Sequence, residues 1–189
     1  MNRRRLVCAL AALAGAAGAR APQKNQEAKK EAEKLAPYLP TPKLVVERML
    51  QLAAVKPGEK LFDLGSGDGR IVIMAAQQFQ ADATGVELDP QLVKESAEQI
   101  HRLGLDAKAR IIQGDLLQQD YSAADVLTVY LLPSANDKLR PILERQLRNG
   151  TRIVAHDFLF RGWIAEREQY IESDGEGRSH TLYLYVIHK

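Results

Sequence analysis

Apolar and polar side chains follow two different periods along most of the chain. Residues 43–55 repeat apolar side chains at helical spacing, which predicts a helix with one buried face. After it, short apolar runs alternate with amphipathic stretches. The runs predict strands over 60–64, 83–87, 109–113, 126–132 and 152–156. The amphipathic stretches predict helices over 70–79, 90–103 and 136–147.

Two further strands are expected near the C-terminus, over 165–172 and 181–188. The glycine-containing segment 173–177 separates them like a hairpin turn, so the two should be antiparallel to each other. The alternation of strands and helices before them indicates βαβ units and a parallel sheet. The pattern therefore predicts an α/β fold with a mostly parallel seven-stranded sheet and an antiparallel C-terminal strand.

The N-terminal 36 residues do not share this pattern. Three arginines, Arg3 to Arg5, precede 14 apolar or small residues, Leu6 to Ala19. A bilayer-spanning helix needs about 20 such residues, so 1–19 is expected to be a signal-like or anchor leader. Residues 20–36 predict a charged linker, and 37–189 form the predicted folded domain.

The charge is divided between these regions. Residues 1–34 hold eight basic and three acidic side chains, a net charge of +5, whereas residues 35–189 carry −3. An acidic body argues against nucleic acid as a partner. One cysteine excludes an internal disulfide framework, and the four histidines show no metal-ligand spacing, so no metal is expected.

The strongest chemical signal is the glycine-rich turn between the strand at 60–64 and the helix at 70–79. Its spacing is G-x-G-x-G, with Asp63 two positions before the first glycine. This differs from the dinucleotide-binding fingerprint. Asp63 would repel a phosphate but attract an ammonium group. The turn residues expected to contact a ligand are Gly65, Ser66, Gly67 and Gly69.

Two more acidic positions end the next two predicted strands. Glu87 can accept both hydroxyl hydrogens of a ribose. Asp115 can accept from an adenine amine, with Leu88 and Leu116 against the faces of the ring. An amino acid end, a ribose and an adenine together describe S-adenosylmethionine as the cofactor.

The motifs DLGSGDGR, GVELD and GDLL, in this order, resemble the class I S-adenosylmethionine-dependent methyltransferases, which have a Rossmann-like fold. TPKLVVERML, VYLLP, HDF and HTLYLYV resemble a narrower family. Its eukaryotic members are mitochondrial protein-lysine methyltransferases acting on the ATP synthase c subunit and the adenine nucleotide translocase. The resemblance implies a protein-lysine N-methyltransferase whose partner is a protein substrate.

Methyl transfer from a sulfonium is an in-line displacement, for which the enzyme mainly supplies alignment. Tyr130 is expected to orient the acceptor amine or else to be a core tyrosine, and His156 either accepts the proton or is a buried structural residue. Pro133 and Asp157 are expected to line the opening through which the acceptor enters. Before the first helix, Tyr38 and Thr41 could close over the methionine end of the cofactor, and Thr41 could also cap the helix.

Other functions stay open at this point. One is a methyltransferase of a small molecule or lipid, and another is a nucleotide-cofactor-binding protein without catalysis. Residues 37–189 contain no cysteine, which excludes covalent cytosine methylation. The leader predicts association with a membrane, or export, through residues 1–19. Because S-adenosylmethionine is made in the cytosol, its supply favours a cytosol-facing domain.

Overall fold

The computed structural model describes residues 39–189. The predicted leader, the linker and Tyr38 lie outside this range. None of the helices in the described range has the length and apolar character needed to cross a membrane.

Strands and helices alternate as the sequence pattern predicts. The strands are β1 (Lys60–Leu64), β2 (Asp82–Glu87), β3 (Ala109–Gln113), β4 (Val126–Val129), β5 (Arg152–His156), β6 (Arg167–Ile171) and β7 (His180–Val186). The helices are α2 (Lys43–Leu52), α3 (Arg70–Gln78), α4 (Pro90–Arg102), α5 (Pro133–Gln146) and the short 3-10 helix η1 (Leu116–Gln118).

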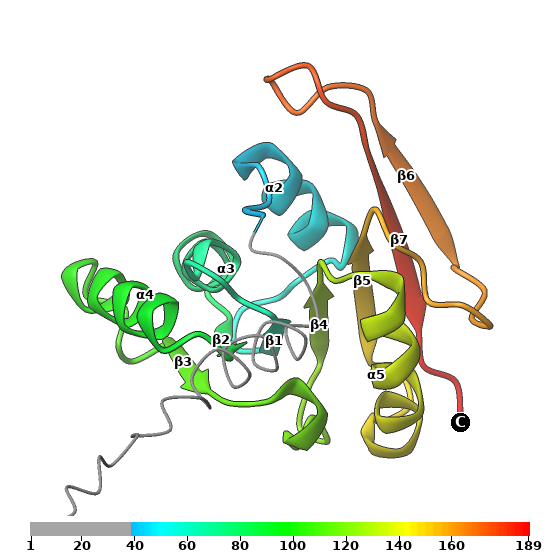
Figure 1. Ribbon diagram of the computed structural model, residues 1–189, viewed down its shortest axis with the longest axis horizontal. Helices are drawn as coiled ribbons and strands as arrows, with labels where there is room; N and C mark the ends of the chain where they lie inside the picture. The colour runs from blue at the N-terminus through cyan, green and yellow to red at the C-terminus, as the bar shows by residue number, and fades with distance from the viewer. Residues whose placement is uncertain (1–38) are drawn as a thin grey trace, which may run out of the picture. The chain divides into compact units, whose positions relative to one another are not determined.

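The strands form one seven-stranded sheet in the order β3-β2-β1-β4-β5-β7-β6. Neighbours from β3 to β5 are parallel, and β7 runs antiparallel between β5 and β6 (Figure 1). The predicted fold class is therefore confirmed, including the antiparallel C-terminal strand. The order reverses between β1 and β4, and in such sheets ligands bind beyond the carboxyl ends of the strands at this point.

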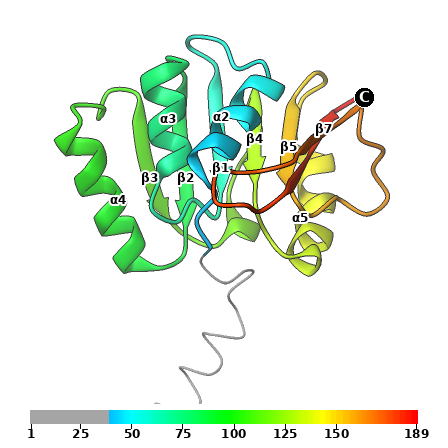
Figure 2. The same ribbon diagram turned by 90° about the horizontal axis from the view of Figure 1, so that it is seen from above.

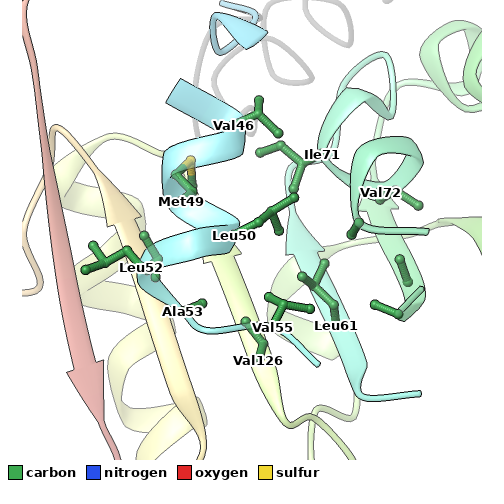
Figure 3. Packing of buried hydrophobic residues seen from close by; sticks show 14 of the residues in the cluster. Val46, Met49, Leu50, Leu52, Ala53, Val55, Leu61, Ile71, Val72 and Val126 are labelled. Atoms are coloured by element: carbon green, nitrogen blue, oxygen red, sulfur yellow. The ribbon is translucent and has the colours of Figure 1, made fainter. Parts of the chain in front are cut away.

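Helices cover both faces of the sheet. One apolar core joins α2 and α3 to one face, where α4 also lies, and a second joins α5 to the other (Figures 1 and 2). Figure 3 shows Val46 and Leu50 of α2 directed toward α3, with Met49 next to them on the same helix. All three are fully buried, so α2 is fixed as a structural layer beside the site and not as a loose cover.

Two local predictions are wrong. The apolar run at 126–132 is a strand only to Val129, because Pro133 begins α5 three residues before the predicted start of that helix. Thr41 does not cap α2, whose N-cap is Pro42. The Thr41 hydroxyl instead lies 3.3 Å from Nδ1 of His156. The second difference places the Thr41 hydroxyl at the carboxyl end of β5.

Candidate active site

The glycine-rich turn follows β1 and packs directly against β2. The backbone amides of Gly65 and Ser66 both donate to the carbonyl oxygen of Val86, each at 3.0 Å. Gly65, Gly67 and Gly69 all have positive φ, which favours glycine at these positions. A Cβ on Gly85 of β2 would lie 2.5 Å from the Ser66 hydroxyl oxygen, so only glycine allows this approach.

Glu87 at the end of β2 ties this turn to the next one. Its Oε2 accepts from the amide of Gly67 at 2.9 Å, and its Oε1 accepts from the amides of Leu88 at 2.8 Å and Asp89 at 2.9 Å. Three backbone donors therefore fix the carboxylate before any ligand arrives. A carboxylate offers about four acceptor sites, so about one remains for a hydroxyl of a ribose.

Asp63 near the end of β1 is buried, with 3% of its surface exposed. Its Oδ1 accepts from the Thr128 hydroxyl of β4 at 2.7 Å. Burial raises the pKa of Asp63 from 3.8 to about 7; the Thr128 hydrogen bond opposes this rise, and the nearby Glu87 and Asp68 carboxylates add to it. A buried carboxylate of this kind favours a cationic ligand, which would restore its charge.

At the end of β3, the Asp115 carboxylate caps η1. It accepts from the amide of Leu117 at 2.9 Å and from the side chain of Gln118 at 3.1 Å. Leu116 is buried, whereas Leu88 is 42% exposed. The predicted adenine contacts thus include one exposed leucine, whose apolar surface a planar ring would cover.

Arg70 connects the glycine-rich turn to the segment before α2. Its Nη2 lies 2.6 Å from Oδ2 of Asp68, and its Nη1 donates to the carbonyl oxygen of Thr41 at 2.8 Å. Thr41 in turn contacts His156. This chain of contacts fixes Thr41 between the turn and the end of β5.

Aromatic and polar side chains gather where β4 and β5 end. The ring centroids of Tyr130 and His156 are 3.9 Å apart, and the Tyr130 and Phe158 rings are stacked at 6.2 Å. Burial and the neighbouring Asp157 carboxylate raise the pKa of Tyr130. Pro133 follows Tyr130 by three positions in the sequence. It begins α5 and is half-buried.

His156 has no exposed surface. Burial lowers its pKa to about 4; the Asp157 carboxylate opposes the shift, and the neighbouring His180 adds to it. The imidazole is therefore neutral at pH 7. Its predicted role as a proton acceptor stays a prediction, and its contact with Tyr130 fits a residue that holds the tyrosine ring.

Three residues of this region were not identified from the sequence. Thr128 interrupts an otherwise apolar run, and that interruption was the available signal. Arg70 and His180 stand in the motifs DLGSGDGR and HTLYLYV, but their contacts could not be predicted, because their partners Thr41 and His156 are 29 and 24 positions away. The predicted ligand residues Asp63, Glu87 and Asp115 do come together at one edge, at the ends of the adjacent strands β1, β2 and β3.

The residues fit a cofactor with an ammonium, a ribose and an adenine. Asp63 is a buried acceptor with a raised pKa, and Glu87 is pre-oriented beside it. The buried hydroxyl of Ser66 has no hydrogen-bond partner among the described residues, so a polar ligand atom could satisfy it.

The comparisons with known proteins identify the family of this chain. The family model described as the ANTKMT methyltransferase domain matches residues 63–167. A protein-lysine N-methyltransferase of Saccharolobus islandicus (strain REY15A) is 42% identical over 152 residues, covering 80% of this chain and 93% of that protein. The adenine nucleotide translocase lysine N-methyltransferase of Mus musculus is 34% identical over 80% of this chain but 63% of its own length.

A solved structure supports the same conclusion. An RNA methyltransferase from Salinibacter ruber in complex with S-adenosyl-L-homocysteine is 47% identical, with a TM-score of 0.73 over 79% of this chain and 94% of that one. S-adenosylmethionine is therefore the cofactor of this chain. The chain belongs to the ANTKMT methyltransferase domain family.

Proposed function

We propose that this protein is an S-adenosylmethionine-dependent protein-lysine N-methyltransferase. The observation that carries the proposal is the group of Tyr130, Asp157 and Phe158 at the ends of β4 and β5, adjacent to the cofactor strand β1. The archaeal relative named as a protein-lysine N-methyltransferase, at 42% identity over nearly its whole length, supports it.

This group suits a lysine side chain. Asp157 keeps 26% of its side chain exposed and can attract an ammonium group. The faces of Tyr130 and Phe158 add cation–π attraction for the same charge. Asp157 and the ring faces favour the charged ammonium and so serve to bind the side chain, whereas the exclusion of water around it lowers the pKa of the lysine and favours the neutral amine that can attack.

In the reaction, the bound cofactor supplies an electrophilic methyl group on a sulfonium. The neutral lysine nitrogen forms the new C–N bond as the C–S bond breaks, and the sulfur keeps the bonding electrons. The proton that the lysine loses beforehand passes to solvent. Tyr130 orients the amine through its hydroxyl, and His156 acts as a positioning residue under the tyrosine ring.

Methylation of RNA is the second candidate, because the Salinibacter ruber structure is described as an RNA methyltransferase. The net charge of −3 over residues 35–189 does not favour it, since RNA-binding surfaces are basic. A small-molecule or lipid acceptor has no specific observation in its favour within the described residues.

The test is radiolabelled methyl transfer from S-adenosylmethionine into membrane and soluble lysate fractions from the source cells. Protease or ribonuclease treatment then identifies the labelled polymer, and mass spectrometry of the hydrolysate identifies the product. We expect protease-sensitive label recovered as methyllysine. Ribonuclease-sensitive label, or label confined to small molecules, would refute the lysine acceptor. Glu87→Ala serves as the inactive control and the surface variant Glu98→Ala as its matched active control.

A further inference from the structure

We propose that His156, Asp157 and His180 form a binding site for a divalent transition metal of the Zn²⁺ type. The site lies where the carboxyl end of β5 meets the start of β7. Nε2 of His156 lies 2.9 Å from Nδ1 of His180. Oδ2 of Asp157 lies 3.0 Å from Nδ1 of His180 and 3.3 Å from Nε2 of His156.

These separations match a shared ion. An ion about 2.0–2.1 Å from each ligand separates neighbouring ligands by about 2.9 Å at right angles and about 3.4 Å in a tetrahedron. Two imidazole nitrogens and one carboxylate oxygen form a set typical of Zn²⁺ and non-haem Fe²⁺. Mg²⁺ and Ca²⁺ prefer oxygen ligands and are not expected to bind here.

Hydrogen bonds satisfy only part of this triangle. If each of the two facing nitrogens carries a proton, both can donate to Asp157, but the 2.9 Å contact between the rings then lacks an acceptor. If only one nitrogen carries a proton, one of the three contacts joins two lone pairs. A cation among the three atoms satisfies all of them together.

The outer atoms of all three ligands are also held. Nδ1 of His156 faces the Thr41 hydroxyl at 3.3 Å, and Nε2 of His180 faces Oδ2 of Asp174 at 3.3 Å. Oδ1 of Asp157 accepts from the amide of Thr181 at 2.9 Å. Metal-bound histidines characteristically donate a hydrogen bond from the N–H of their second ring nitrogen to a carboxylate or another polar oxygen, which fixes the ring and its tautomer.

Asp174 is itself fixed before it contacts His180. Its side chain is fully buried and accepts from the amides of Glu176 at 2.8 Å and Arg178 at 3.1 Å. Asp157 has the positive φ of +58°, which turns its carboxylate back toward the two histidines. The 26% exposure of the Asp157 side chain gives an ion access to ligands that are otherwise buried, and a bound ion would take the place at this carboxylate that the proposed function gives to the lysine ammonium, so the two occupants are alternatives.

The experiment measures Zn²⁺ and Co²⁺ binding to the full-length chain by calorimetry, with Mg²⁺ as the comparison ion. All proteins carry Cys8→Ser, which removes the one thiol of the sequence. The test variants are His180→Gln and Asp157→Asn. The matched controls are His101→Gln and His188→Gln, exposed histidines that also pair with carboxylates. Binding of S-adenosylhomocysteine verifies that each variant is folded.

We expect one Zn²⁺ per chain, a Co²⁺ visible spectrum showing nitrogen and oxygen ligands, and no comparable Mg²⁺ binding. His180→Gln and Asp157→Asn should weaken binding by more than about 10-fold, and Asp174→Asn, which changes only the partner of His180 Nε2, by about 10-fold. The control variants should bind like the parent. Absence of saturable binding, or equal affinity in the test and control variants, would overturn the proposal.

Discussion

The two halves of the active site are built in different ways. In the cofactor half, Glu87 and Asp115 are held mainly by backbone amides close to them in sequence, such as those of Leu88 and Leu117. In the acceptor half, Tyr130, His156 and His180 hold one another through side-chain contacts between different strands. Asp63 is the exception in the cofactor half, because the Thr128 hydroxyl of β4 holds it; otherwise this half depends on local backbone geometry, and the acceptor half depends on the pairing of strands.

This difference has a consequence for substitutions. A carboxylate that is held by its own loop takes up its position whenever that loop forms. Removing it should therefore remove its own contact with the ligand and nothing else. A side chain held by distant side chains shares its position with them, so each replacement disturbs its neighbours. Changes in the cofactor half should thus act on affinity, and changes in the acceptor half on turnover.

The largest expected effect is that of Glu87→Ala. The substitution removes the proposed ribose acceptor and the hydrogen bond that holds the Gly67 amide. Hydrogen bonds to a charged group contribute about 1.5–3 kcal/mol each, so affinity for S-adenosylhomocysteine should fall by at least about 100-fold. Calorimetry measures it, and unchanged affinity would remove Glu87 from the cofactor site. Glu98→Ala, on the exposed side of α4, is the control.

Asp63→Asn should weaken cofactor binding by about 10-fold or more while stabilising the free protein. The pKa of Asp63 is about 7 in the folded protein against an ordinary 3.8. Its ionisation therefore opposes folding increasingly from pH 4 to pH 7, and constantly above that. Asparagine does not ionise, so the variant is not destabilised in this way. Its free energy of unfolding at pH 8 should exceed that of the parent by about 1–3 kcal/mol.

The pH dependence of binding gives an independent check on Asp63. In the parent protein, affinity for S-adenosylhomocysteine should rise with pH up to about 7 and level off above it, because an ammonium group binds the ionised carboxylate. In Asp63→Asn this dependence should vanish. A parent whose affinity is flat between pH 5.5 and 8 would show that Asp63 does not meet the charged end of the cofactor.

Tyr130→Phe tests the acceptor half. Loss of the hydroxyl should lower kcat by about 10-fold with little change in cofactor affinity, since the ring and its stacking on Phe158 are kept. Steady-state kinetics with a lysine-containing protein substrate measures both quantities. Tyr170→Phe, an exposed tyrosine on β6, is the matched control. A loss confined to cofactor affinity would contradict the division of the site.

The smallest expected effect is that of Asp115→Asn. Asparagine keeps the oxygen that caps η1 and removes only the charge. Affinity for S-adenosylhomocysteine should fall by about 2–5-fold, the size of one weakened hydrogen bond to the adenine amine. Asp115→Ala removes the cap as well and should lower affinity further. Equal affinities for the parent and both variants would show that Asp115 is structural.

The two halves of the site also differ in how far the sequence predicts them. The turn with Gly65 and Gly67, and the carboxylates Asp63 and Glu87, follow strand ends that can be read from the alternation of apolar and polar residues. The end of β4 at Val129 was not predictable, because apolar residues continue past it to Leu132. The missing cap at Thr41 reflects a competing contact with His156, 115 positions away.

The sequence by itself determined the α/β fold and the order of its elements, and it predicted the carboxylates of the cofactor half. These depend on local periodicity and on parallel strands whose carboxyl ends share one edge. Only the tertiary structure decided that Thr128 holds Asp63 and that His180 meets His156 and Asp157. Those contacts depend on which strands become neighbours, and the insertion of β7 between β5 and β6 is set by the packing of the whole sheet.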